Sequence, residues 1–297
     1  MKRTLRLLLI WGVLLLLCAC AANTEPVTAA PTEAPSEEPT FVPPEEEQLQ
    51  LPTPMVAEQI EAPTPPPRVL ATAEPLPPLS GLVIGLDPGH QQKANYEQEA
   101  VAPHSDETKA KCSAGTRGTV SNVYEYEVNL AVALKLRALL EAKGAKVILT
   151  RTENDVNLSN RQRAERMNEN EVDLAIRLHC NGTDDSSVRG AFMLVPNKEC
   201  TEFFTENVQA ASAIIEHYCA VTGLSMRKNK GISYSSTQTG FNWCTRPIVC
   251  IEMGHLSNET EDLLLTNDAF QDKMAFGIFE GILAYFRPEA SEEGGNG

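Results

Sequence analysis

Positive charge is scarce in this sequence, which has 25 Lys and Arg side chains against 40 Asp and Glu and a formal net charge of −15 at pH 7. Much of the acidic excess lies in residues 21–80, which hold ten Glu and a single basic side chain, Arg68. Residues 81–288 keep a net charge of −6, from 21 basic and 27 acidic side chains, and show no basic cluster of the kind that binds phosphate backbones. The composition therefore predicts no nucleic-acid partner.

Several enzyme and metal-site motifs are also missing. The sequence contains no HExxH, GxSxG or P-loop pattern, so the enzyme classes that these motifs mark lose their main support. The six cysteines after Cys20 include no CxxC pair and do not fit a zinc ribbon. A domain of this size does not need disulfides, and we expect Cys219 and Cys250 to be small buried apolar side chains.

The N-terminus has the features of a lipoprotein-type signal peptide over residues 1–20. Three basic residues precede the apolar run Leu7–Leu17, which at eleven residues is too short to span a bilayer. The next residues, Leu-Cys-Ala-Cys, resemble a bacterial lipobox and predict lipidation of Cys20. Ordinary signal cleavage after Ala21 fits the same residues. We expect an exported protein, lipid-anchored to the outer face of the cytoplasmic membrane and working in the cell wall.

The uneven distribution of proline and aromatic residues separates the rest of the chain into a linker and a domain. Residues 21–80 hold fifteen of the 20 prolines and only one aromatic side chain, Phe41. Such a segment cannot bury enough apolar surface to offset its ordering entropy, so we expect a disordered linker. Residues 81–288 have an ordinary composition and are expected to fold as one monomeric domain, followed by a frayed acidic tail at 289–297.

Apolar patterns within residues 81–288 predict alternating strands and helices. Strands are expected at residues 82–86, 146–150, 173–179, 190–195 and 247–251, and helices at 124–143, 159–170, 199–222 and 258–286. A polar loop of about thirty residues, Gln91 to Asn122, follows the first strand, and its length indicates a functional insertion. The alternation predicts an α/β fold, a single layered domain with a central, mostly parallel sheet flanked by helices.

Three side chains able to bind metals or protons follow predicted strands. His90 comes after the first strand through an Asp-Pro-Gly turn, His179 ends the third strand, and Glu252 ends the last. Ligands of parallel sheets bind at the carboxyl ends of the strands, so we expect these three residues to lie at the same end of the sheet. Glu125 opens the helix after the long loop, but that helix is apolar on more than one side, so its phase does not place Glu125.

The same residues have simpler interpretations. A single histidine at a strand end is more often structural than a ligand, and a carboxylate at a helix start, such as Glu125, commonly serves the helix dipole. Glu252 follows four apolar residues, where a carboxylate is costly unless it is paired or functional. His104 and Glu107 have the HxxE spacing of some zinc peptidases, but their polar surroundings cannot hold them rigid, and we reject them as ligands. Spacing alone leaves the metal site open.

Five sequence blocks, in order and at compatible spacing, resemble the zinc-dependent N-acetylmuramoyl-L-alanine amidases, the cell-wall autolysin type known as amidase family 3. The blocks are Ile84–His90, Glu125–Leu130, Leu149–Arg151 with Asp155, Leu158 and Arg161, His179–Asn181, and Ile251–Asn258. The likeness runs from about Leu82 to Phe286 and implies an α/β domain that hydrolyses peptidoglycan. We interpret the block around residues 150–161 as structural.

The resemblance implies roles for individual residues. His90, Glu125 and His179 match the family's zinc ligands, and Glu252 matches its catalytic glutamate. A zinc ion with three such ligands and one open position lowers the pKa of a bound water to about 7. By analogy that water attacks the lactyl carbonyl of N-acetylmuramic acid, Glu252 accepts its proton, and the amine of L-alanine leaves.

Some residues depart from the family's pattern. Gln91-Gln92 replaces further glycines after the first histidine, and the loop that follows could narrow or regulate the site. Arg177 stands where a small polar residue is common, and His255 where an aromatic is common. These differences put substrate preference in doubt. Two alternatives to the active amidase stay open. One is a different enzyme on the same scaffold, either a zinc peptidase that trims stem peptides or an amidase that acts on a modified wall, and the other is a catalytically silent wall-binding or regulatory lipoprotein.

Overall fold

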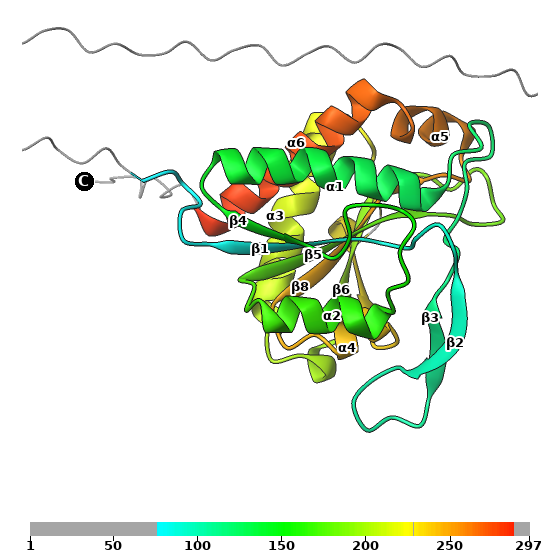
Figure 1. The fold of residues 1–297 in the computed structure, drawn as a ribbon. Coiled ribbons are helices and arrows are strands. Elements are labelled where there is room, and N and C mark those ends of the chain that lie inside the picture. Colours follow the sequence, from blue (N-terminus) through cyan, green and yellow to red (C-terminus); the bar gives the residue numbers. More distant parts are fainter. Residues whose placement is uncertain (1–75, 228, 288–297) are drawn as a thin grey trace, which may run out of the picture. The chain divides into compact units, whose positions relative to one another are not determined.

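The computed structural model describes residues 76–227 and 229–287 (Figure 1). The predicted signal peptide with Cys20, the predicted linker up to residue 75, and the predicted tail lie outside these residues. Leu79, which we had placed in the linker, is fully buried in the core, and its N–H donates to the Lys143 carbonyl over 2.9 Å. The packed domain therefore begins before the expected boundary at Gly81.

A six-stranded sheet forms the centre of the domain, in the order β4-β1-β5-β8-β6-β7. Its strands are β1 (Val83–Pro88), β4 (Lys146–Leu149), β5 (Leu174–Asn181), β6 (Phe192–Pro196), β7 (Ile232–Ser235) and β8 (Ile248–His255). The first four in the order are parallel, whereas β6 runs antiparallel to β8 and β7 runs parallel to β6. The sheet is mostly parallel, as predicted.

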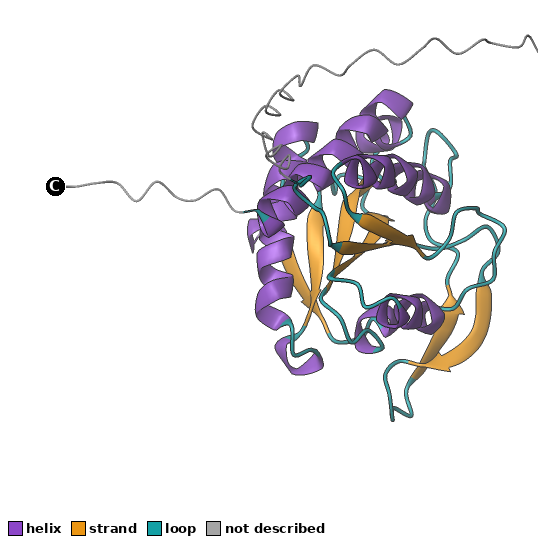
Figure 2. Cartoon of the chain, turned by 60° about the vertical axis from the view of Figure 1, so that its left-hand side comes forward, coloured by secondary structure: helices purple, strands orange, loops and turns teal. Residues whose placement is uncertain are grey.

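Helices cover both faces of this sheet (Figure 2). The helices are α1 (Glu125–Ala142), α2 (Asn160–Glu169), α3 (Phe204–Thr222), α4 (Thr239–Asn242), α5 (Glu259–Leu265) and α6 (Asp268–Phe286). Helices α1, α3 and α6 pack together over one face and enclose the large apolar core, while α2 and α4 cover a smaller apolar cluster on the other. Burial on both faces explains why the central strands are almost continuously apolar.

Local sequence signals set the helix boundaries. The Ser159 hydroxyl accepts from the Gln162 N–H over 3.1 Å and the Gln162 side chain accepts from the Ser159 N–H over 2.9 Å, the capping box expected at the start of α2. The predicted single helix over 258–286 is wrong. Helix α5 ends at Leu265, and Asn267 caps a new helix, α6, by accepting from the Phe270 N–H over 3.0 Å.

The segment expected to be one long polar loop contains a β-hairpin. Strands β2 (Asn95–Ala100) and β3 (Thr108–Cys112) pair in antiparallel fashion and form a separate two-stranded sheet beside the main one (Figure 1). Their side chains are mostly exposed, so neither strand has the apolar alternation that would have predicted it. Strand β7 was also missed, because two of its four residues are serines and only Ile232 is buried, which leaves no apolar run.

The described residues answer two further questions from the sequence. All six cysteines of the domain are free thiols; Cys250 is buried, as expected, and Cys219 is half-buried against the core. Within residues 76–287, residue 228 apart, no helix is both long and apolar enough to cross a bilayer.

Candidate active site

The candidate site lies at the carboxyl ends of β1, β5 and β8, the edge of the sheet where the sequence placed it. His90 follows β1 after one residue, Gly89, and His179 and Glu252 are paired neighbours in the register of β5 and β8. Glu125 reaches the same place from the first residue of α1 and is only 3% exposed. The fold therefore brings together all four residues that the sequence had singled out.

His90, Glu125 and His179 form a tight cluster. The Nε2 atom of His90 lies 3.2 Å from Oε2 of Glu125, and Nδ1 of His179 lies 3.0 Å from Oε1 of the same carboxylate. One donor atom from each residue lies within 4.8 Å of the other two. The two close contacts are near the spacing, roughly 3.4 Å, of donor atoms held about 2.1 Å from one tetrahedral ion.

Neighbouring backbone groups orient His90 and Glu125. Nδ1 of His90 lies 3.0 Å from the Ser113 carbonyl, which turns Nε2 toward Glu125. The Glu125 carboxylate accepts from the backbone N–H groups of Thr116 over 2.9 Å and Cys180 over 3.1 Å. Outer contacts of this kind fix the orientation of histidine and carboxylate ligands in metal sites.

Two buried polar atoms at the site lack any hydrogen-bond partner, Nε2 of His179 and Oε2 of Glu252. An unpartnered buried polar atom is costly in a folded protein unless something outside the chain completes it. The two-histidine, one-carboxylate donor set fits a cation such as zinc, and the unpartnered atoms of His179 and Glu252 remain to be satisfied by a substrate or a water.

Burial and mutual contact shift the pKa values of these groups. Burial lowers the pKa of His179 to about 4 despite its contact with Glu125. For His90 the effect of burial is outweighed by the Glu125 carboxylate, which raises the pKa to about 10. Burial, reinforced by the negative charge of Glu125, raises the pKa of Glu252 to about 8. A carboxyl group in that range can exchange a proton near neutral pH.

Two buried arginines hold the backbone that carries His90. Nη2 of Arg163 donates to the His90 carbonyl over 2.9 Å, and Nη2 of Arg151 donates to the Gly89 carbonyl over 3.1 Å. Both arginines also donate to the Pro88 carbonyl over 2.9 Å. His90 has a φ of 58°, in the left-handed region that costs a non-glycine residue about 1 kcal/mol or more. These bonds hold it there.

Asp87 anchors this arrangement from beneath. Its Oδ1 atom accepts from Arg163 over 2.8 Å and from the Thr150 hydroxyl over 2.7 Å, and its Oδ2 atom accepts from Arg177 over 2.9 Å. Burial alone would raise the pKa of Asp87, but the two guanidinium groups hold it well below its usual range. Asp87 therefore stays charged and pairs with Arg163, which in turn donates to the Pro88 and His90 carbonyls.

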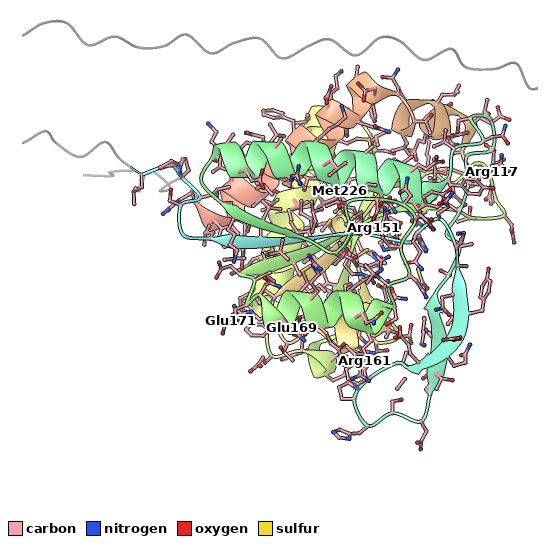
Figure 3. All side chains as sticks on the ribbon, in the orientation of Figure 1. Arg117, Arg151, Arg161, Glu169, Glu171 and Met226 are labelled. Atoms are coloured by element: carbon pink, nitrogen blue, oxygen red, sulfur yellow. The ribbon has the colours of Figure 1, made fainter. Side chains whose placement is uncertain are left out.

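Arg163 was missed by the sequence analysis, which had named Arg161 in this block. Arg161 lies on the exposed side of α2, over the Trp243 ring at 4.0 Å from its centroid, whereas Arg151 lies deep between α1 and α2 (Figure 3). The signal that would have found Arg163 is its position beside Ala164 and Met167 on the buried face of α2. The block that we had interpreted as structural thus supports a ligand residue.

Comparison with known proteins fits this geometry. A family model described as N-acetylmuramoyl-L-alanine amidase matches residues 84–284, which is more than half of the chain. This chain belongs to the N-acetylmuramoyl-L-alanine amidase family. The germination-specific amidase of Bacillus subtilis is 31% identical to this amidase over 223 residues, covering 70% of this chain and 81% of that protein.

Solved structures agree with the assignment. The catalytic domain of an amidase from Bacillus (Paenibacillus) polymyxa is 26% identical, with a TM-score of 0.55, and the match covers 69% of this chain and 97% of that one. An amidase from Mycobacterium smegmatis has a TM-score of 0.65 at 22% identity, over 70% of this chain and 98% of that one, and supports the fold. The predicted family, fold class and hydrolase activity on the cell wall are confirmed.

Two clefts flank the cluster of the amidase. One, of about 560 Å³, contains Glu125 and Glu252 and has the exposed Tyr96 at its edge. The other, of about 450 Å³, lies between the β2–β3 hairpin and the segment before α4 and includes Arg177 and Lys109. His90 and His179 line both clefts, so the cluster stands where they meet.

Four other residues that the sequence analysis had discussed can now be placed relative to the cluster and the clefts. His104 and Glu107 are exposed in the turn of the hairpin, away from the cluster. His255 is fully buried, 6.2 Å from the Phe192 ring between centroids, and its ring nitrogens have no hydrogen-bond partner. Arg177 is buried beneath the second cleft.

Proposed function

We propose that this amidase hydrolyses the bond between N-acetylmuramic acid and L-alanine in peptidoglycan with a zinc ion held by His90, Glu125 and His179. Bound there, zinc would polarise the scissile carbonyl and activate water near neutral pH. The observation that carries the proposal is the convergence of these three side chains beside the unpartnered Oε2 atom of Glu252.

Glu252 is the proton carrier in this mechanism. Its carboxylate lies on β8 beside His179, close to the ligand cluster without being one of its members. It accepts the proton of the attacking water and delivers it to the nitrogen of the leaving L-alanine, so one group serves as base and then as acid. The raised pKa of Glu252, about 8 in the protein alone, matches a group that must both accept and release a proton.

His90 and His179 are held rigidly in the site. The Ser113 carbonyl and the arginine contacts fix the His90 ring and its backbone, and the packing of Gly89 against the His179 ring fixes the second histidine. A rigid site of this kind loses little free energy to reorganisation as charge develops on the substrate.

The test is the chemistry of the newly created ends. The protein, loaded with zinc, is incubated with purified bacterial peptidoglycan, and the products are examined for new amino termini and new reducing sugars. We expect new N-terminal L-alanine without new reducing ends. New termini at other residues would instead establish a stem-peptide peptidase, and no new ends would favour a silent wall-binding protein.

We also propose that the protein is exported and anchored through a lipid on Cys20. The support is the basic start, the short apolar run and the Leu-Cys-Ala-Cys sequence of the N-terminus. In the producing cell, Cys20→Ser should move the protein from the membrane fraction to the soluble wall or medium fraction. If the variant stays with the membrane, the lipidated cysteine is not the anchor.

A further inference from the structure

The two clefts beside the ligand cluster are lined by different ionisable side chains. The cleft with Tyr96 at its edge contains the carboxylates of Glu125 and Glu252. The other contains Lys109 and Arg177, and no carboxylate lines it. A substrate that extends to both sides of the cluster therefore meets acidic groups on one side and cationic groups on the other.

The cationic cleft lies over an unbalanced buried charge. Asp87 pairs with both Arg163 and Arg177, which are 1% and 5% exposed, so one carboxylate faces two guanidinium groups. Arg151 is also buried. It donates to carbonyl groups, so no further carboxylate is present to balance its positive charge. Buried charge is costly unless it is paired, and the imbalance is relieved if an anion enters beside Arg177.

Arg177 is held ready for such a partner. Its Nη1 atom donates to the Gln238 side chain over 2.8 Å and its Nη2 atom donates to the Asn160 side chain over 2.9 Å. A guanidinium has five N–H donors, and three are used here, so each terminal nitrogen keeps one. A β-carbon on Gly240 would lie 2.8 Å from Cζ of Arg177, which shows how closely the backbone packs against the guanidinium.

Lys109 supplies a second cation from the opposite wall. It lies on β3, and its ammonium donates to the Thr237 carbonyl over 2.7 Å, which ties the hairpin to the segment before α4. An ammonium has three donors, so two remain for a ligand in the cleft. The hairpin thus places the flexible Lys109 side chain opposite Arg177, which is held in place by its hydrogen bonds on the sheet.

The distance between Arg177 and the ligand cluster determines which part of a bound substrate Arg177 can contact. Arg177 and His179 are two residues apart on β5 and so project to the same face, about 7 Å apart along the strand. Two residues of extended peptide also span roughly 7 Å. A carboxylate on the residue that follows L-alanine is therefore spaced to reach Arg177 when the scissile bond lies at the ligand cluster.

From these observations we infer that the cleft between Arg177 and Lys109 binds a free carboxylate of the stem peptide, on the leaving-amine side of the scissile bond. The inference rests on the proposed function and names the part of the substrate that sets its specificity. The other cleft has no lysine or arginine among its lining residues, so it offers the same carboxylate no such partner, and the difference between the two clefts sets the direction in which the substrate lies.

The test compares two soluble muropeptides that differ at one group. Both contain N-acetylmuramic acid, L-alanine and one further residue, which has either a free carboxylate or the corresponding carboxamide. Steady-state cleavage by the zinc-loaded protein is measured for the wild type, Lys109→Gln, Arg177→Gln and the matched control Lys111→Gln. Lys111 is on the same strand, pairs with Glu97 over 2.7 Å and lies outside the cleft lining.

We expect the wild type to prefer the carboxylate substrate roughly tenfold in kcat/KM, mainly through KM, the size of effect a charged hydrogen bond gives. Lys109→Gln should reduce the preference to roughly threefold. Arg177→Gln should abolish it, and Lys111→Gln should keep it. Because Arg177 also pairs with Asp87, Lys109 supports the test if the Arg177 variant does not fold.

Two outcomes overturn different statements. Equal cleavage of both substrates by the wild type, or an equal change of preference in Lys109→Gln and Lys111→Gln, would overturn the carboxylate subsite and leave the amidase mechanism standing. Cleavage of neither muropeptide, nor of whole peptidoglycan, would overturn the proposed function and the subsite with it.

Discussion

His179 and Glu252 are paired across β5 and β8, so that the ring of one and the carboxylate of the other lie side by side at the edge of the sheet. Each has a buried side-chain atom without a hydrogen-bond partner. Only His179 belongs to the cluster of possible ligands, which also contains His90 and Glu125. Two neighbours in one register thus have separable roles, one in holding a cation and one in moving a proton.

Replacing Glu252 with Gln should separate these roles. We expect zinc content to stay at the wild-type level, because Glu252 is not a ligand, while kcat falls by roughly 10²- to 10⁴-fold through loss of the proton carrier. Zinc is measured by elemental analysis and activity by release of N-terminal L-alanine. Glu259→Gln, an exposed carboxylate at the start of α5, is the control. A parallel loss of zinc in Glu252→Gln would make Glu252 a ligand.

Gly89 should tolerate no side chain. A β-carbon there would lie 2.1 Å from Cε1 of His179, well inside van der Waals contact, so the ring must move. We expect Gly89→Ala to weaken zinc affinity by roughly 10- to 100-fold, the usual effect of disturbing the support of a ligand. Zinc titration checks the affinity, and circular dichroism checks that the fold remains. Unchanged affinity would show that His179 is not held by this contact.

Arg163 and Arg161 offer a matched pair on one helix. Arg163→Met removes the donors to the Pro88 and His90 carbonyls, releases the strained backbone of His90 and should lower both kcat and zinc affinity by about tenfold or more. Arg161→Met removes an exposed pair with Glu165 and should change stability by less than about 1 kcal/mol. Equal effects of the two substitutions would contradict a positioning role for Arg163.

Asp87 should make stability depend on acid pH. Its pKa is depressed in the folded protein, so its contribution is present above the unfolded pKa of about 3.9 and is lost as pH falls below it. We expect Asp87→Asn to lower the free energy of unfolding by about 3 kcal/mol at pH 7, because it leaves two buried guanidinium groups without their carboxylate.

That difference has a defined pH profile. It should be constant between pH 5 and pH 7 and narrow by about 1.4 kcal/mol per pH unit below about pH 4, as measured by urea unfolding. Asp155→Asn, which removes an exposed partner of Lys93, is the control and should cost less than about 1 kcal/mol. A difference that grows toward low pH would reverse the assigned sign of the pKa shift.

The sequence located the site because its chemistry lies at strand ends. Apolar runs placed β1, β5 and β8, and the polar residue after each run is where a parallel sheet gathers its functional groups. Glu125 could not be placed by helical phase, since α1 is buried on more than one side. Its contacts with His90, His179 and the Cys180 N–H, all distant in sequence, show why it faces inward.

Other features depend on tertiary contacts that leave no local pattern. The β2–β3 hairpin has mostly exposed strands and is fixed by contacts with distant residues, such as the bond from the Trp243 ring to the Ala100 carbonyl over 2.8 Å. Arg163 lies in a strongly polar helix whose buried stripe is narrow, so its burial is visible only once β1 is beside it. The break before α6 is marked by the Asn267 cap, but the apolar pattern continues across it, so the sequence predicted one helix instead of two.

The β2–β3 hairpin is one uninterrupted stretch of chain, whereas the candidate ligands come from β1, α1 and β5. The wall that supplies Lys109 to the cationic cleft can therefore be exchanged, lengthened or lost as a unit, while the strand-end residues stay where they are. In this architecture the Lys109 side of the cationic cleft is encoded apart from the candidate ligands, whereas Arg177 shares β5 with His179 and is inherited together with it.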